Sequence, residues 1–141
     1  MSAPNKNPAI LDKLGLSGGP AGLMTQARSD ISAEHYLRLA SLVDRDPYCL
    51  AAALGITEAR IQQWIAGGEV GIEEIDGVYR LILVVDATLQ LFEADVAAAQ
   101  IWLKVPCRGL GGKAPFEMLT THTEMQAVLD LIGRLERGVA I

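Results

Sequence analysis

Residues 102–141 have the sequence WLKVPCRGLGGKAPFEMLTTHTEMQAVLDLIGRLERGVAI. Pro106 and Pro115 flank the glycine pair Gly111-Gly112, and a helical pattern follows them. Pro106 should end any preceding helix, because proline disfavours the helical conformation in the residue before it. The two glycines allow a sharp reversal, and Pro115 has a backbone angle suited to the first turn of a short helix. We interpret these four residues as structural turn positions that orient the last helix.

The last helix is predicted over residues 123–137, with Thr121 or Thr123 as its capping residue. Apolar residues recur in it at helical spacing and should form its buried face. They are Met125, Val128, Leu129, Ile132 and Leu135. Arg134 and Arg137 fall in the last turn, where positive charge interacts favourably with the helix dipole.

The end of the chain combines a helix stop with an apolar tail. Gly138 is a candidate C′ residue, since glycine tolerates the left-handed backbone that ends many helices. Val139, Ala140 and Ile141 follow it and have no obvious core to join. They are therefore candidates for insertion into a partner, and a frayed end or a dimer contact is equally consistent with the sequence.

The composition is that of a folded protein without a cofactor signature. The chain has 141 residues, of which 50% are hydrophobic and 21% are charged, enough for one domain or two very small ones. Cys49 and Cys107 lack the spacing of a zinc site or a disulfide framework. Because no secretion signal and no bilayer-length apolar run is present, we expect a cytoplasmic protein without membrane contact.

Acidic side chains are concentrated in the middle of the sequence. Residues 44–99 contain three basic and ten acidic side chains, whereas residues 1–43 contain four and three and residues 100–141 contain five and four. Phosphate neutralisation normally supplies much of the affinity for DNA. The acidic middle therefore argues against tight, unaided nucleic-acid binding.

Residues 1–29 are predicted to form a flexible N-terminal tail. Pro4, Pro8 and the GGPAG run at residues 18–22 disfavour regular structure. An arm that becomes ordered on a partner is the functional alternative.

Residues 30–76 are predicted to form a helix-turn-helix domain. Ser32 can cap a first helix that ends before Pro47. Residues 47–68 then give two short helices separated by Gly55, which suits a tight turn.

The second helix of this pair carries outward residues suited to DNA contact. They are Thr57, Glu58, Arg60, Gln62 and Gln63. Glutamine can bond adenine and arginine can bond guanine or phosphate, whereas Glu58 repels phosphate unless it accepts from cytosine. The same pattern is also consistent with an αα-hairpin of a helical core that does not contact DNA.

Two further helices are predicted to follow. Residues 77–93 are rich in residues typical of strands, but their length and one-sided apolar spacing favour a helix after a short turn at residues 72–75. The next helix begins at Asp95 and ends near Leu103. One face of it contains, at helical spacing, Ala97, Ala98, Ile101 and Trp102. We predict that the indole of this face belongs to the core.

Several of these positions together resemble a known family. The pattern comprises Trp102-Leu103, Pro106, Leu110-Gly111-Gly112, Pro115, a helix and then Gly138. It is similar to the toxin-binding domain of the Xre/MbcA/ParS antitoxins over roughly residues 89–141. The resemblance implies an all-α fold, with an Xre-like helix-turn-helix domain followed by a small helical toxin-binding domain at residues 77–141.

The resemblance also implies a function, that of an antitoxin of a type II toxin–antitoxin pair. The cognate partner would be a RES-domain toxin that degrades NAD, and the antitoxin would occlude its active site. The implied toxin-binding residues are Arg134, Arg137, Gly138, Val139, Ala140 and Ile141. A terminal carboxylate there could pair with arginines that hold the pyrophosphate of the dinucleotide. A homodimer or higher assembly would bind operator DNA and repress its own operon.

Two rival functions stay open. One is a stand-alone helix-turn-helix regulator whose C-terminal half serves dimerisation, and the other is a structural adaptor with no DNA contact. An enzyme is not expected, because His35 and His122 lie in no catalytic motif.

Overall fold

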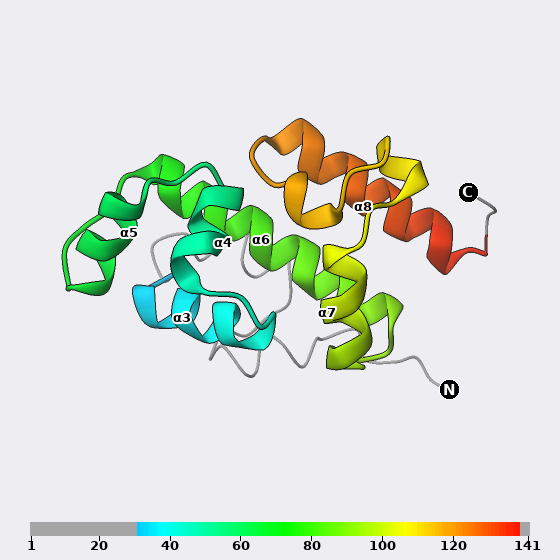
Figure 1. The fold of residues 1–141 in the computed structure, drawn as a ribbon, viewed down its shortest axis with the longest axis horizontal. Helices are drawn as coiled ribbons and strands as arrows, with labels where there is room; N and C mark the ends of the chain where they lie inside the picture. Colours follow the sequence, from blue (N-terminus) through cyan, green and yellow to red (C-terminus); the bar gives the residue numbers. More distant parts are fainter. Residues whose placement is uncertain (1–30, 139–141) are drawn as a thin grey trace.

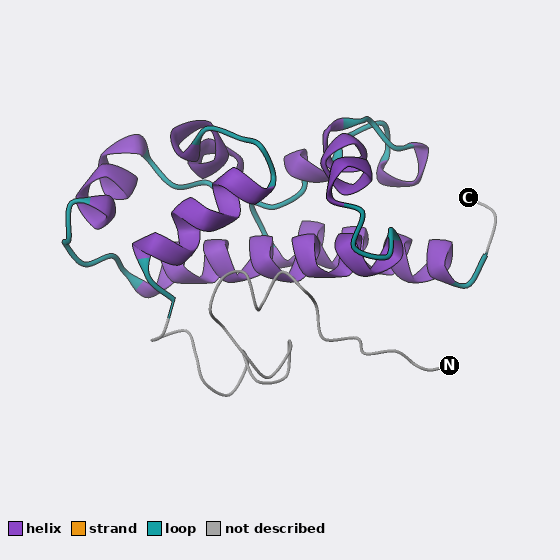
Figure 2. Ribbon diagram, turned by 90° about the horizontal axis from the view of Figure 1, so that it is seen from below, coloured by secondary structure: helices purple, strands orange, loops and turns teal. Residues whose placement is uncertain are grey.

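The computed structural model describes residues 31–138, which form six α-helices, α3 to α8, and two 3-10 helices, η2 and η3. No strand occurs among these residues (Figure 2), so the prediction of an all-α fold is confirmed for them. None of their helices is long and apolar enough to cross a bilayer. The predicted flexible tail at residues 1–29 and the tripeptide at residues 139–141 lie outside the described residues.

Three short helices pack on one another in the N-terminal part of the described chain. They are α3 (Ala33–Leu42), α4 (Pro47–Ala53) and α5 (Glu58–Ile65). The side chains of Ser32, Asp46 and Thr57 accept hydrogen bonds from first-turn amides of these helices, which otherwise lack partners. The turn between α4 and α5 contains Gly55 with φ of +80°, as its glycine predicts.

Aromatic rings fill the space between these three helices. The ring centroids of Tyr36 and Trp64 lie 5.9 Å apart. The Tyr36 hydroxyl donates a hydrogen bond to the carbonyl of Pro47, which ties α3 to the start of α4. Burial, with a smaller contribution from the Asp46 carboxylate, raises the pKa of this hydroxyl, which therefore stays protonated.

The long helix α6 (Ile72–Leu91) runs through the molecule, with α3 to α5 toward one end and α7 and α8 toward the other (Figure 1). The helix predicted for residues 77–93 is confirmed, but it begins at Ile72, and the short turn predicted at residues 72–75 is wrong. The reason is local: the Glu74 carboxylate accepts a hydrogen bond from the Gly71 amide at 2.7 Å and closes the first helical turn.

Helix α6 is buried on almost every side. Its buried residues are Gly77, Val78, Tyr79, Leu81, Ile82, Val84, Val85, Asp86, Thr88 and Leu89. An all-round burial of this kind is typical of a helix at the centre of a core. The predicted domain boundary between residues 76 and 77 falls inside this helix, and one hydrophobic cluster extends from residue 31 to residue 132.

Helix α7 (Val96–Lys104) does not bury the face that its spacing suggests. Ala99 and Leu103 are buried, whereas Ile101 is 64% exposed. Trp102 is only partly buried and lies 6.3 Å, centroid to centroid, from the ring of Phe92. The prediction that Trp102 belongs to the core is therefore confirmed in part, since it packs against the core but is only partly buried. Helical spacing defines a face but not the side on which the core lies, so Ile101 of the same predicted face is exposed.

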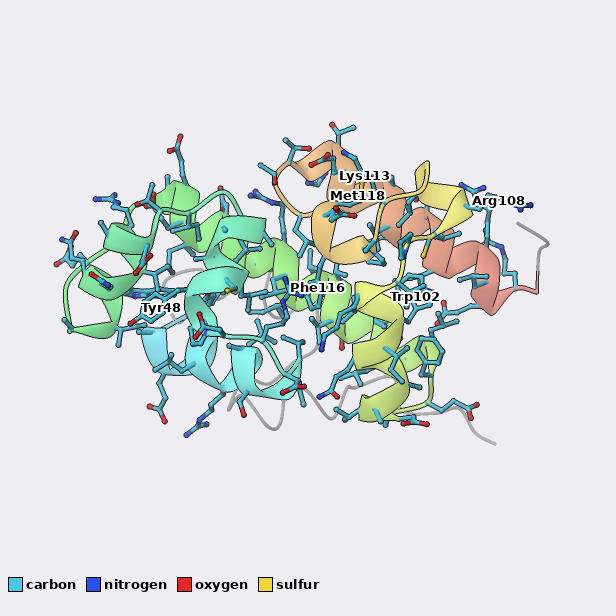
Figure 3. The ribbon with its side chains drawn as sticks, in the orientation of Figure 1. Tyr48, Trp102, Arg108, Lys113, Phe116 and Met118 are labelled. Atoms are coloured by element: carbon cyan, nitrogen blue, oxygen red, sulfur yellow. The ribbon has the colours of Figure 1, made fainter. Side chains whose placement is uncertain are left out.

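Contacts between distant parts of the sequence join the two ends of the molecule. The Gln100 side chain on α7 donates to the Leu42 carbonyl at the end of α3, over 2.7 Å. The Arg45 guanidinium lies 4.7 Å from the centroid of the Phe116 ring. Figure 3 shows Phe116 between the two parts, where this cation–π contact couples the α3–α4 loop to the C-terminal connector.

Candidate partner-binding surfaces

The connector between α7 and α8 is a compact loop held by backbone hydrogen bonds. Val105 has an extended backbone, with φ of −99° and ψ of 133°, immediately before Pro106. The Cys107 carbonyl accepts a hydrogen bond from the Gly112 amide at 3.0 Å. Gly111 and Gly112 have φ values of +70° and +87°, a conformation that favours glycine.

The connector continues through two 3-10 helices, η2 (Arg108–Leu110) and η3 (Pro115–Glu117). Pro115 is the first residue of η3, and the next residue, Phe116, is buried. The Ala114 amide donates to the Glu117 carboxylate at 2.8 Å, which closes this short turn. These two turns set the direction in which the chain enters α8.

Helix α8 (His122–Glu136) begins after Thr121, whose hydroxyl accepts from the Glu124 amide at 3.1 Å. Three of the residues predicted for its inner face are buried: Met125, Val128 and Ile132. Leu131 is buried as well, whereas Leu129 and Leu135 are only partly buried. Leu135 is therefore accessible at the last turn of the helix.

The end of α8 is a regular helix stop. The Arg137 amide donates to the Gly133 carbonyl at 3.2 Å, and the Gly138 amide donates to the Leu135 carbonyl at 3.1 Å. Gly138 has φ of +74°, the left-handed backbone of a C′ residue. Of the predicted toxin-binding residues within the described chain, Arg134, Arg137 and Gly138 are all exposed. They belong to the last turn of α8 and the residues after it, and Figure 1 shows that α8 ends at one end of the molecule.

A hollow of about 270 Å³ lies beside this end of α8. It is lined by Trp102, Cys107, Arg108, Gly109, Leu131 and Leu135. Burial raises the pKa of the Cys107 thiol, so the sulfur contributes as a neutral, apolar group. Figure 3 shows Trp102 and Arg108 at this end of the molecule and Tyr48 near the other.

A second hollow, of about 380 Å³, lies on the outer side of α7. It is lined by Phe92, Ala98, Ile101, Trp102 and Val105. Ile101 and Val105 are 64% and 46% exposed, although both are large apolar residues. Trp102 lines both hollows, and we call the residues that line the two hollows the Trp102 surface.

The predicted DNA-contact residues are all exposed along α5 and its cap. Thr57 uses its hydroxyl to accept from the Arg60 amide at 3.3 Å. Gln62 donates from its side-chain amide to the Glu58 carboxylate, also at 3.3 Å, while Gln63 projects from the same exposed stretch. In Figure 1, α5 lies at the end of the molecule away from the end of α8.

Arg60, the one basic member of this set, has an acidic partner. Its Nη2 lies 3.3 Å from Oε1 of Glu74 on α6. Burial raises the pKa of Glu74, but the hydrogen bonds from Arg60 and the Gly71 amide more than offset this, so its pKa is below the usual value. The ionised carboxylate reduces the positive charge that Arg60 presents to a phosphate.

Residues 87–138 match the family model described as the antitoxin Xre/MbcA/ParS C-terminal toxin-binding domain. This match confirms the resemblance inferred from the connector and the last helix. The family is defined by binding and not by catalysis, in agreement with the prediction of a non-enzymatic chain.

Two curated relatives bear the name Antitoxin Xre. One, from Yersinia enterocolitica, is 43% identical over 67 residues, which cover 48% of this chain and 45% of the relative. The other, from Photorhabdus laumondii, is 38% identical over 72 residues, which cover 51% of this chain and 49% of the relative. The chain thus spans about half the length of the curated relatives it matches.

The Trp102 surface was not predicted from the sequence. A nine-residue helix needs one apolar face to pack on a core, and Ala99 and Leu103 supply it in α7. Ala98, Ile101 and Val105 form additional apolar positions beside that face. These additional apolar positions are visible in the sequence and could have indicated the surface, because exposed apolar area that the fold does not need is typical of an interaction surface.

Proposed function

We propose that this chain is the antitoxin of a type II toxin–antitoxin pair and that its C-terminal domain binds and neutralises the toxin. The observation that carries the proposal is the exposed, partly apolar end of α8 within residues 87–138, the part that matches a toxin-binding domain. From the family resemblance, we infer that the toxin has a RES domain and degrades NAD. Both proteins would act in the cytoplasm.

The proposed mechanism is occlusion of the toxin active site. Gly138 ends α8 with a positive φ, close in sequence to exposed Arg134 and Arg137, and Val139, Ala140 and Ile141 follow it in the sequence. In the complex, these apolar side chains would fill the entrance to the NAD site. Filling such an entrance requires no chemistry from the antitoxin, only a fixed helix that directs the tail.

Neutralisation and DNA binding are proposed to use opposite ends of the molecule. We infer that α5 contacts operator DNA and that two copies in a dimer reach half-sites about 34 Å apart, one turn of the duplex. The support is the exposure of Gln62 and Gln63, which could read bases in the major groove. The Arg60–Glu74 pair leaves little positive charge here, so isolated binding should be weak and salt-sensitive.

The test of the antitoxin proposal is co-purification with the product of the neighbouring reading frame. A stable complex in which that product loses its NAD-degrading activity supports an antitoxin. Operator binding without any such complex would favour the stand-alone regulator, and neither activity would favour the adaptor.

A double variant, Gln62→Ala with Gln63→Ala, tests the assignment of α5. Operator binding should be lost while the complex with the toxin forms as before, because the two surfaces lie at opposite ends of the molecule. Unchanged operator affinity would reject this helix as the DNA-reading element.

A further inference from the structure

We propose that the outer face of α7 is the docking surface for the toxin, distinct from the tail that blocks the active site. This inference rests on the proposed antitoxin function and divides it into two steps, docking and occlusion. The occupant is an apolar segment of the toxin that covers Ile101, Trp102 and Val105.

The first support is exposure that the fold itself does not require. Ala99 and Leu103 already pack α7 on the core. Gln100 bonds to Leu42 at 2.7 Å, and Lys104 lies 3.8 Å from the Asp44 carboxylate. The helix is therefore fixed before any partner binds, and a fixed surface loses less conformational entropy in forming a complex.

The second support is the composition of the face. Its centre holds the exposed side chain of Ile101, beside partly buried Phe92 and Trp102. Exposed charges flank it, with Glu93 next to Phe92 and Lys104 beyond Trp102. An apolar, partly aromatic centre with a charged rim is the usual arrangement of a protein–protein interface.

The third support is that the hollow beside the end of α8 and the hollow on the outer face of α7 share Trp102. This favours the toxin over a second copy of the chain as the occupant of the α7 face. Gly138, the last described residue, follows Leu135 by three residues and so lies at most about 11 Å from it, and Leu135 lines the first hollow. A toxin that receives the tail must therefore approach this hollow, and it then meets Trp102, which is shared with the α7 face. A second copy on that face would compete for the same indole.

The experiment measures binding of the purified product of the neighbouring reading frame to variants of the full chain. Ile101→Lys and Ile101→Glu should both weaken binding at least about tenfold, because each places a charge in an apolar contact. Ile72→Lys and Ile72→Glu are matched controls, since Ile72 is also helical and is 61% exposed but lies outside residues 87–138. The controls should change the Kd by no more than about twofold.

A deletion of residues 139–141 separates docking from occlusion. The shortened chain should still bind the toxin with a smaller loss of affinity than the Ile101 variants, but it should no longer inhibit it. Circular dichroism melting checks that each variant is folded, and Val105→Lys provides a second substitution on the same face.

Several outcomes would overturn the docking assignment. Wild-type affinity in both Ile101 variants would do so, and so would opposite effects of Lys and Glu, which indicate long-range charge and not contact. Unchanged toxin affinity combined with loss of self-association, measured by light scattering, would assign the face to a dimer. A wild-type chain that binds no toxin would instead reject the proposed antitoxin function itself.

Discussion

Nε of Arg80 on α6 lies 2.9 Å from the carbonyl oxygen of Leu119, 39 residues further along the chain, and donates a hydrogen bond to it. Its Nη2 donates to the Thr120 carbonyl at 3.0 Å, and the Thr120 hydroxyl donates to the Ala53 carbonyl at 3.3 Å. One guanidinium thus holds the segment before α8 against α6, and that segment in turn contacts the end of α4. The direction in which α8 presents its end depends on this junction.

Replacing Arg80 by Met should lower the free energy of unfolding by about 1–3 kcal/mol, because two carbonyl groups lose a charged donor. Urea denaturation followed by circular dichroism measures the loss. Arg38→Met is the matched control, since the Arg38–Glu34 pair is exposed and should contribute no more than about 1 kcal/mol. Equal losses in the two variants would contradict a structural role for the junction.

Asp86 is a buried carboxylate on α6, with 3% of its surface exposed. Gln90 donates to one of its oxygens at 3.0 Å, and the other oxygen has no hydrogen-bond partner within the described chain. Burial raises the pKa of Asp86 to about 6, although the Gln90 hydrogen bond lowers it in part. The folded protein therefore holds this proton more tightly than the unfolded chain, and ionisation destabilises the fold.

The sign of the pH dependence follows from that raised pKa. Stability from protonated Asp86 is fully present below about pH 4, the unfolded value, and is lost as the pH rises through about 6. Asp86→Asn should therefore raise the free energy of unfolding at pH 8 by up to about 2–3 kcal/mol, and by much less at pH 4. Urea titrations of both proteins at the two pH values check this, and a pH-independent difference would contradict it.

Two glycines should respond oppositely to alanine. Gly55 has φ of +80°, and a Cβ there would lie 3.2 Å from the Thr120 methyl group, so Gly55→Ala should destabilise by about 1–2 kcal/mol. Gly133 is inside α8, where a Cβ would meet only the flexible end of Arg137 at 3.4 Å, so Gly133→Ala should stabilise by about 0.5–1 kcal/mol. Thermal melts of both variants measure the signs, and two changes of the same sign would refute this view of the turn.

Local chemistry explains why much of the fold was predictable from sequence. Ser32 and Thr57 cap helices where their hydroxyls predict caps, and Gly138 ends α8 with the expected positive φ. The family match over residues 87–138 likewise follows from a connector whose prolines and glycines are visible in the sequence. These features depend on residues within a few positions of one another.

Of the two features that escaped prediction, the start of α6 depends on a local contact, and the outward face of α7 depends on contacts between distant residues. The start of α6 at Ile72 was not predicted, because the glycines near it disfavour a helix in the sequence pattern. The Glu74 carboxylate nevertheless accepts a hydrogen bond in the first turn. The outward face of α7 is set by the Ala99 and Leu103 packing and by the Gln100 bond to Leu42, 58 residues away. No periodicity within α7 alone distinguishes its two apolar sides, so the exposure of Ile101 became evident only in the fold.

Occlusion of the toxin is measured by the rate of NAD loss that the purified toxin catalyses in the presence of equimolar full-length chain or of the chain without residues 139–141. The full chain should stop NAD loss, and the shortened chain, although still bound to the toxin, should allow it to continue. Equal inhibition by the two chains would contradict occlusion by the residues beyond Gly138.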